Sequence, residues 1–242
     1  VIGVGNDAFG NCFELESVHI SSGVKSIGAY VFSNCKKLKY VKIDEGLASI
    51  DNYAFANCCS LESITIPESV QSIGGATFVN CSKLDSVTIL AKSVSVGNSP
   101  FLNCDNLSSV TISTSSLWST FSSLYSIASV TILNGDESIG ERTFQGCGNL
   151  KSVTISEGVI NINDHAFYNC NNLEKIIMPQ SIVSIGNYVF YGCKSLTSIN
   201  IPLGVENMGT SVFTGCNSLK TVTIPSCDIW TIFDDNESIE CV

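Results

Sequence analysis

The chain has 242 residues, 44% of them hydrophobic and only 14% charged, with a formal net charge of −10 and a pI near 4.5. This length and hydrophobic content suffice to bury a core, which excludes a disordered chain. The few Lys and Arg residues are scattered, which excludes a surface that binds a phosphate backbone, so we expect no nucleic-acid partner. No apolar run approaches the roughly 18 residues that span a bilayer, and no leader pattern follows Val1, so we expect no membrane insertion within this segment and take the chain as part of a longer protein.

A 23-residue repeat runs through the whole chain. Phenylalanine occurs at positions 9, 32, 55, 78, 101, 121, 144, 167, 190, 213 and 233. All steps are 23 residues except Phe101 to Phe121 and Phe213 to Phe233, which are 20, so the segments Ile112 to Phe121 and Ile224 to Phe233 are shortened. A period of this length predicts a solenoid. We therefore expect one domain, residues 1–242, of about eleven repeats.

Each repeat also carries a predicted strand. An aliphatic residue follows the Phe by six positions, and a Val-x-Ile segment comes next, as in Val18/Ile20 and Val87/Ile89. Apolar and polar residues alternate there among β-branched side chains, which predicts a strand with one buried face. The chain then turns and returns through an apolar pair such as Val70 and Ile73. Stacked copies predict one parallel sheet over a continuous Phe, Leu, Val and Ile interior.

The position four residues before the Phe holds a small turn residue in nine repeats. Its occupants are Gly5, Gly28, Asp51, Gly74, Gly97, Gly140, Asn163, Gly186 and Gly209. These residue types tolerate a positive φ, so a left-handed conformation is predicted there. The two short repeats carry Leu117 and Ile229 instead, followed by Trp118 and Trp230. Each indole is expected to fill the shortened segment, with a ligand-stacking platform as the alternative.

Cysteine follows the Phe by three residues in nine repeats. These residues are Cys12, Cys35, Cys58, Cys81, Cys104, Cys147, Cys170, Cys193 and Cys216. Parallel Cβ directions in stacked coils suit a disulfide poorly, so we expect buried free thiols. Cys59, Cys227 and Cys241 lie outside this series, and their spacing pairs none of them. No Cys-x-x-Cys is present to indicate a zinc site.

Few residues suggest catalytic chemistry. His19 is expected to point outward from a strand and His165 to lie on a surface turn, more than six repeats away, which denies them a shared triad or metal site. The Gly3–Ala8 segment mimics a dinucleotide fingerprint without its strand and helix. Asp234, Asp235, Glu237 and Glu240 leave a cation site open beside a solvated chain end. We predict no enzyme, and no catalytic, cofactor or metal site.

The repeat F-x-x-C-x-x-L-x-x-V-x-I, with segments such as TIPESVQSIGGATFVNC (65–81) and IPLGVENMGTSVFTGC (201–216), resembles BspA-like leucine-rich repeats over nearly the whole chain. The resemblance implies a leucine-rich-repeat solenoid, a β-rich α/β fold. It would be a right-handed curved coil with a parallel sheet on the concave face and short strands, turns or short helices on the convex face. It also implies a cell-surface or secreted location and attachment to host matrix proteins or other cells. The inner Asn common in leucine-rich repeats is missing, since its position holds Gly23, Gly46, Ser69 or Gly158.

The outward residues beside each buried Val form a candidate protein-binding surface. It comprises Ser17, His19, Tyr40, Lys42, Thr65, Thr88, Thr111, Thr131, Thr154, Lys175, Ile177 and Asn200. We hypothesise that Tyr40/Lys42 and Lys175/Ile177 edge the contact, because small hydroxyls alone bind weakly. Alternatively, the hydroxyl rows merely solubilise the sheet.

Three functions remain open. The favoured one is an adhesion or protein-binding module whose partner is a host extracellular-matrix protein or another cell surface. A structural spacer that presents another domain is the alternative. The regular Ser-x-Thr rows are also compatible with ice binding, although interrupting Lys, Tyr and His residues disfavour it.

Overall fold

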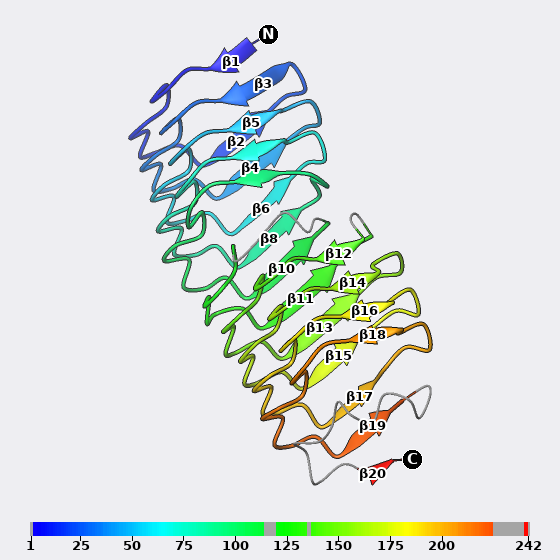
Figure 1. Ribbon diagram of the computed structural model, residues 1–242. Helices are drawn as coiled ribbons and strands as arrows, with labels where there is room; N and C mark the ends of the chain where they lie inside the picture. Colours follow the sequence, from blue (N-terminus) through cyan, green and yellow to red (C-terminus); the bar gives the residue numbers. More distant parts are fainter. Residues whose placement is uncertain (1, 114–119, 135–136, 225–239, 242) are drawn as a thin grey trace. The chain divides into compact units, whose positions relative to one another are not determined.

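The computed structural model describes residues 2–113, 120–134, 137–224 and 240–241, and the chain divides into two compact units, Val1–Ile112 (unit 1) and Ser113–Val242 (unit 2). Both units are stacks of coils built from short parallel strands and turns (Figure 1). The described ranges contain strands and turns opposite the longer strands, and none of the short helices that were also considered. They also contain no helix long and apolar enough to cross a membrane.

Unit 1 has two faces of parallel strands. The longer strands are β2 (Ser17–Ile20), β4 (Tyr40–Ile43), β6 (Ser63–Ile66), β8 (Ser86–Ile89) and β10 (Ser109–Ile112). Strand β2 pairs with β4, and β8 pairs with both β6 and β10, each residue facing the residue 23 positions away. The other face holds β1 (Ile2–Val4), β3 (Val24–Ile27), β5 (Ser49–Ile50), β7 (Ser72–Ile73) and β9 (Ser95–Val96), paired in that order.

Unit 2 repeats this arrangement. Its longer strands are β11 (Ser129–Ile132), β13 (Ser152–Ile155), β15 (Lys175–Ile177), β17 (Ser198–Asn200) and β19 (Thr221–Thr223), and β20 (Glu240–Cys241) pairs with β19. The opposite face holds β12 (Ser138–Ile139), β14 (Asn161–Ile162), β16 (Ser184–Ile185) and β18 (Asn207–Met208). All ten Val-x-Ile segments predicted as strands are confirmed. Strands β15, β17 and β19 end one residue before the second apolar position.

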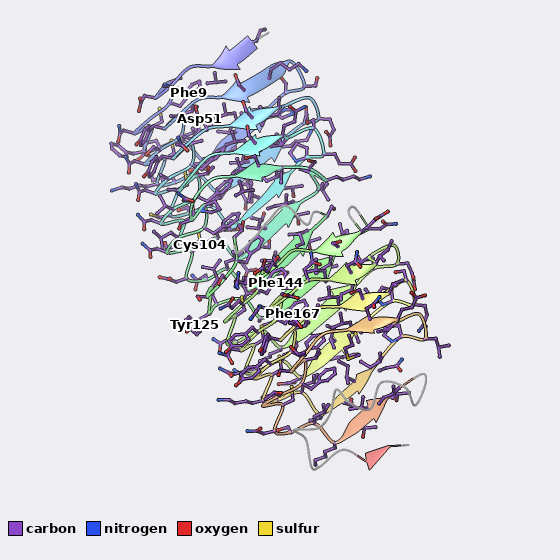
Figure 2. All side chains as sticks on the ribbon, in the orientation of Figure 1. Phe9, Asp51, Cys104, Tyr125, Phe144 and Phe167 are labelled. Atoms are coloured by element: carbon purple, nitrogen blue, oxygen red, sulfur yellow. The ribbon has the colours of Figure 1, made fainter. Side chains whose placement is uncertain are left out.

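The core of each unit is a column of stacked phenylalanine rings. In unit 1 the ring centroids from Phe9 to Phe101 are 5.2 to 5.5 Å apart in successive coils. In unit 2 the centroids from Phe121 to Phe213 are 5.6 to 5.7 Å apart, and Figure 2 labels two of these rings, Phe144 and Phe167. Phe9, in the first coil, is 45% exposed, whereas Phe32 and the later rings of the column are at most 2% exposed. Burial of large aromatic side chains in offset stacks therefore stabilises both units.

The turn prediction is wrong in position. The residues four before the Phe do not have a positive φ; it occurs instead two residues before and two after it, as at Tyr53 (57°) and Asn57 (60°). The glycines are needed for another reason. A Cβ on Gly74 would overlap the backbone of Asn52, and one on Gly209 would lie 2.5 Å from the backbone N of Asn187, whereas one on Gly5 meets nothing. The preceding coil approaches too closely for a side chain.

Several predictions fall on residues outside the described ranges. Trp118 and Trp230, with their neighbours Leu117 and Ile229, lie there, and so do Cys227 and the acidic residues Asp234, Asp235 and Glu237. Glu240 and Cys241 are described only as part of β20. The indole-filled segments and the C-terminal cation site stay predictions.

Candidate functional site

The outward side chains of the longer strands align in two rows on each unit. The pairings place Ser17 beside Tyr40 and His19 beside Lys42, and they place Thr65, Thr88 and Thr111 in one line. Thr131, Thr154 and Ile177 form the corresponding line in unit 2. Unit 1 thus carries seven of the twelve predicted surface residues and unit 2 carries five. Strand register aligns these residues within the β2–β4 pair and within β6, β8 and β10 of unit 1, and within β11, β13 and β15 of unit 2. Strands β2–β4 and β17 belong to separate sheets, so the one parallel sheet predicted from the repeats is divided.

All twelve predicted surface residues reach solvent. Tyr40 is 61% exposed and Ile177 is 46% exposed, which is unusual for side chains of their size on a sheet. The Thr residues of strands β8, β10 and β11 are half-buried. The rows are therefore flat and rich in hydroxyls, with one exposed large apolar or aromatic side chain on each unit.

A carboxylate that the sequence analysis missed neutralises the basic end of the unit 1 row. Asp44 Oδ2 lies 2.8 Å from His19 Nε2, and its Oδ1 lies 3.0 Å from Lys42 Nζ. The hydrogen bond from Lys42, and then that from His19, holds the pKa of Asp44 below its ordinary value. Asp44 directly follows strand β4. A carboxylate at the end of a Val-x-Ile segment is therefore the sequence feature that could have predicted these contacts. The surface around Tyr40 therefore offers mixed charge rather than a cationic patch.

The cysteines of the repeat form a second buried column. Eight of the nine are buried and free, which confirms the prediction for them, and each thiol donates to the Phe carbonyl of the preceding coil. The Sγ to O distances are 3.2 Å for Cys58 to Phe32 and 3.3 Å for Cys81 to Phe55. Burial raises the pKa of Cys147 to about 12, so these thiols are poor nucleophiles.

The remaining described cysteines differ from that column. Cys12, in the first described coil, is exposed, contrary to the prediction. Cys59 is half-buried and its thiol donates to the carbonyl of Asn57 at 3.4 Å. Neither has a partner cysteine in the part of the chain that the structure describes.

An asparagine ladder that was not predicted runs along unit 1. Asn11, Asn34, Asn57, Asn80 and Asn103 each follow a Phe by two residues. From Asn34 onward, each side-chain amide donates to the amide oxygen of the Asn in the preceding coil at 2.8 to 3.0 Å. Their recurrence every 23 residues is the sequence signal for the ladder, which lies at a different position from the usual Asn, eight residues after the Leu. The corresponding positions in unit 2 are Ser123, Gly146, Asn169, Gly192 and Gly215. The ladder is therefore a feature of unit 1.

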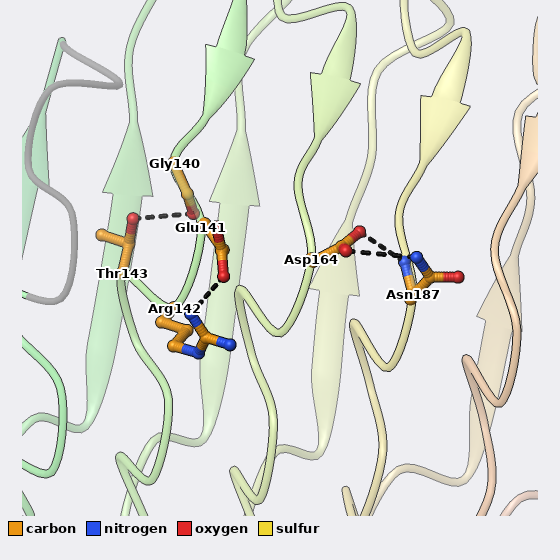
Figure 3. A network of polar contacts seen from close by, with 6 residues as sticks. All are labelled: Gly140, Glu141, Arg142, Thr143, Asp164 and Asn187. Carbon is orange, nitrogen blue, oxygen red and sulfur yellow. Dashed lines mark hydrogen bonds and ion pairs between the residues drawn. The ribbon is translucent and has the colours of Figure 1, made fainter.

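Aromatic and polar side chains occupy the turns of unit 2. His165 is half-buried rather than on open surface as expected, because its ring packs against Tyr188 at 5.0 Å and Tyr168 at 5.4 Å. Figure 3 shows polar contacts on a neighbouring part of these coils, where Asp164 accepts from the backbone N and the Nδ2 of Asn187, at 2.7 and 3.1 Å. These contacts join successive coils. Across the described ranges, no three His, Cys, Asp or Glu side chains gather where a metal ion could bind.

Parallel strands, a 23-residue coil and a stacked Phe core define a leucine-rich-repeat solenoid. The family described as "BspA type Leucine rich repeat region (6 copies)" matches residues 3–117 and again residues 118–236. The chain belongs to this family, as its repeat motif predicted. The matching family is described as a repeat region, and the match points to no enzyme family.

Solved structures similar to the chain include several bacterial leucine-rich-repeat proteins. A leucine-rich repeat protein of Bacteroides ovatus is 22% identical with a TM-score of 0.41, over 100% of this chain and 88% of that one. A leucine rich cell surface protein of Faecalibacterium prausnitzii is 25% identical with a TM-score of 0.46, over 100% and 82%. The pneumococcal vaccine antigen PcpA is 27% identical with a TM-score of 0.41, over 92% and 53%. No curated protein matches the chain.

Proposed function

We propose that this chain is a protein-binding or adhesion module of a cell-surface or secreted protein, and that it has no catalytic activity. Leucine-rich-repeat proteins generally serve as interaction modules. The observation that carries the proposal is the alignment of exposed side chains along the longer strands, in register from coil to coil. The ligand would be a protein of the host extracellular matrix or of another cell surface.

The chemistry of the rows sets how such a surface would bind. Rows of small hydroxyl side chains can complement the shape of a partner protein but contribute little binding free energy. Most of that free energy comes from large anchor side chains such as Tyr. Tyr40 with Lys42, and Lys175 with Ile177, supply one such anchor region on each unit. Modest affinity for each region would be raised by avidity when many copies of the protein lie on one surface.

A capture assay tests this function. The wild-type chain is expected to bind an immobilised extracellular-matrix preparation or intact bacterial cells, and the combined variant Tyr40→Ala, Lys42→Ala, Lys175→Ala and Ile177→Ala should lose that binding. The control carries Tyr53→Ala, Lys83→Ala, Lys194→Ala and Leu203→Ala, which remove similar exposed side chains outside the rows. Unchanged capture by the row variant would remove the proposal for these residues.

A structural spacer is the alternative function. The small hydroxyls that dominate the rows would also suit a sheet that only needs to stay soluble, with another domain carrying the ligand site. The spacer predicts no capture by the wild-type chain from any matrix or cell preparation. Ice binding by the same rows predicts thermal hysteresis, which we expect to be absent because Tyr40, Lys42 and Lys175 interrupt the hydroxyl pattern.

A further inference from the structure

A hollow of about 240 Å³ lies among the turns of unit 2, away from the strand rows. It is lined by Ser123, Tyr125, Gln145, Gly146, Tyr168, Asn169 and Asn171. These residues come from three successive coils and from the segment between each core Phe and the strand that follows it. Figure 2 labels Tyr125 at the outer edge of these turns, away from the strands.

Two residues that line this hollow carry a side-chain acceptor without a hydrogen-bond partner among the described residues. The side-chain oxygens of Gln145 and Asn171 are buried from solvent and unpaired among the described residues. The third such atom, Nδ1 of His165, is not part of the lining. Unpaired buried acceptors destabilise a fold, so native proteins rarely retain them without a use. Two unpaired amide oxygens on side chains that border one small space indicate that a ligand with hydroxyl or amide donors belongs there.

Two tyrosines form the aromatic wall of the hollow, and neighbouring residues keep their rings from filling it. Tyr168 stacks on Tyr191 with ring centroids 4.9 Å apart, which fixes its ring. Tyr125 is 65% exposed, and a Cβ at Gly148 would come within 3.1 Å of its ring. Gly146 has a φ of 73° and contributes no side chain to the space. The hollow therefore combines two tyrosines with uncharged polar groups.

From this geometry we propose that the hollow binds a neutral pyranose residue of a glycan. A sugar ring presents several hydroxyl donors, which would pair with Gln145 and Asn171, and an apolar face of C–H groups, which would lie against a tyrosine. No charged side chain belongs to the lining, so an anionic ligand would lack a counter-charge. The volume is below the about 300 Å³ at which pockets for drug-sized ligands begin, which suits one sugar unit. This site does not depend on the strand rows.

The test uses NMR titration of the whole chain with the methyl pyranosides of glucose, galactose, mannose and N-acetylglucosamine. We expect at least one to shift signals of the unit 2 turns. Gln145→Met and Asn171→Leu keep the side-chain shape and remove the acceptor, so each should weaken binding about tenfold. Their melting temperatures should equal or exceed that of the wild type, because each variant removes an unpaired buried group. A site kept only for structure would not give this combination.

Matched controls make the outcome decisive. Asn172→Leu alters the neighbouring amide, which is exposed and pairs with Asn149, and Tyr53→Ala removes an exposed tyrosine of unit 1. Both should bind the sugar like the wild type, whereas Tyr125→Ala should bind more weakly. The proposal is overturned if none of the four glycosides binds, if Gln145→Met and Asn171→Leu bind normally, or if only the anionic N-acetylneuraminic acid binds.

Discussion

Units 1 and 2 each have the same type of core and differ in their turns. Both stack Phe rings at nearly the same spacing and both bury thiols that donate to Phe carbonyls. In unit 1 the position two residues after the Phe is Asn in five successive coils, and the amides satisfy one another. In unit 2 Ser, Gly and Asn alternate there, and two nearby amide oxygens are left unpaired beside a hollow. The repeat thus determines the core. Individual turn residues determine whether polar side chains of neighbouring coils pair with one another or leave a space that can accept a ligand.

The largest expected effect is one that the two units share. Phe78→Ala in unit 1 and Phe167→Ala in unit 2 should each reduce the free energy of unfolding by about 3 to 5 kcal/mol, because each removes a fully buried ring between two others. Urea denaturation measures both. A loss below about 1 kcal/mol in either variant would show that its ring is not packed in the column.

A smaller effect separates the two explanations for the glycines that recur four residues before the Phe. Gly209→Ala should destabilise the fold by about 1 to 3 kcal/mol, because the added methyl group meets the backbone of Asn187. Gly5→Ala occupies the equivalent place in the first coil, where nothing lies within 4 Å, and should be close to neutral. Equal losses at both positions in thermal unfolding would favour a requirement of the local turn over contact between coils.

The buried thiols predict a loss of stability at alkaline pH that is equal in both units. Burial raises the pKa of Cys104 and Cys147 from 9.0 to about 12, so between these values the thiols ionise only in the unfolded chain. The unfolded state then binds fewer protons, and stability falls as pH rises, by about 1.4 kcal/mol per pH unit for each thiol. Below pH 8 the contribution is constant.

Comparing pH profiles of unfolding isolates this contribution. Cys104→Ala and Cys147→Ala should each show a shallower decline between pH 9 and 11 than the wild type. A decline unchanged in both variants would contradict a buried, protonated thiol at these positions.

The smallest expected effect sharpens the difference between the units. Asn57→Ala interrupts the ladder of unit 1. Because Asn34 Oδ1 then loses its donor and Asn80 Nδ2 loses its acceptor, the variant should lower stability by about 1 to 2 kcal/mol. Ser123→Ala changes the equivalent position of unit 2, which has a similar positive φ, and should stay within about 0.5 kcal/mol. Chemical denaturation of both variants measures the contrast, and similar losses would remove the distinction drawn here.

Features that repeat every 23 residues were accessible from the sequence, and those that depend on contacts between particular coils were not. Spacing alone identified the Phe column, the strands and eight of the buried thiols, because identical positions of stacked coils must meet. Gly74 was misassigned because glycine serves both positive φ and close approach, and only the neighbouring backbone distinguishes the two. The hollow beside Tyr125 and Gln145 escaped prediction because it requires different side chains from three coils to leave a space.

The contact between neighbouring core rings tests the account most directly. In a chain with isotopically labelled phenylalanine, nuclear Overhauser effects between the ring protons of Phe55 and Phe78 should be strong, because the two centroids are 5.5 Å apart and the planes differ by 6°. Assignment through Phe55→Leu and Phe78→Leu would identify the pair. Absence of that cross-peak in the folded protein would contradict a solenoid in which successive coils share one interior.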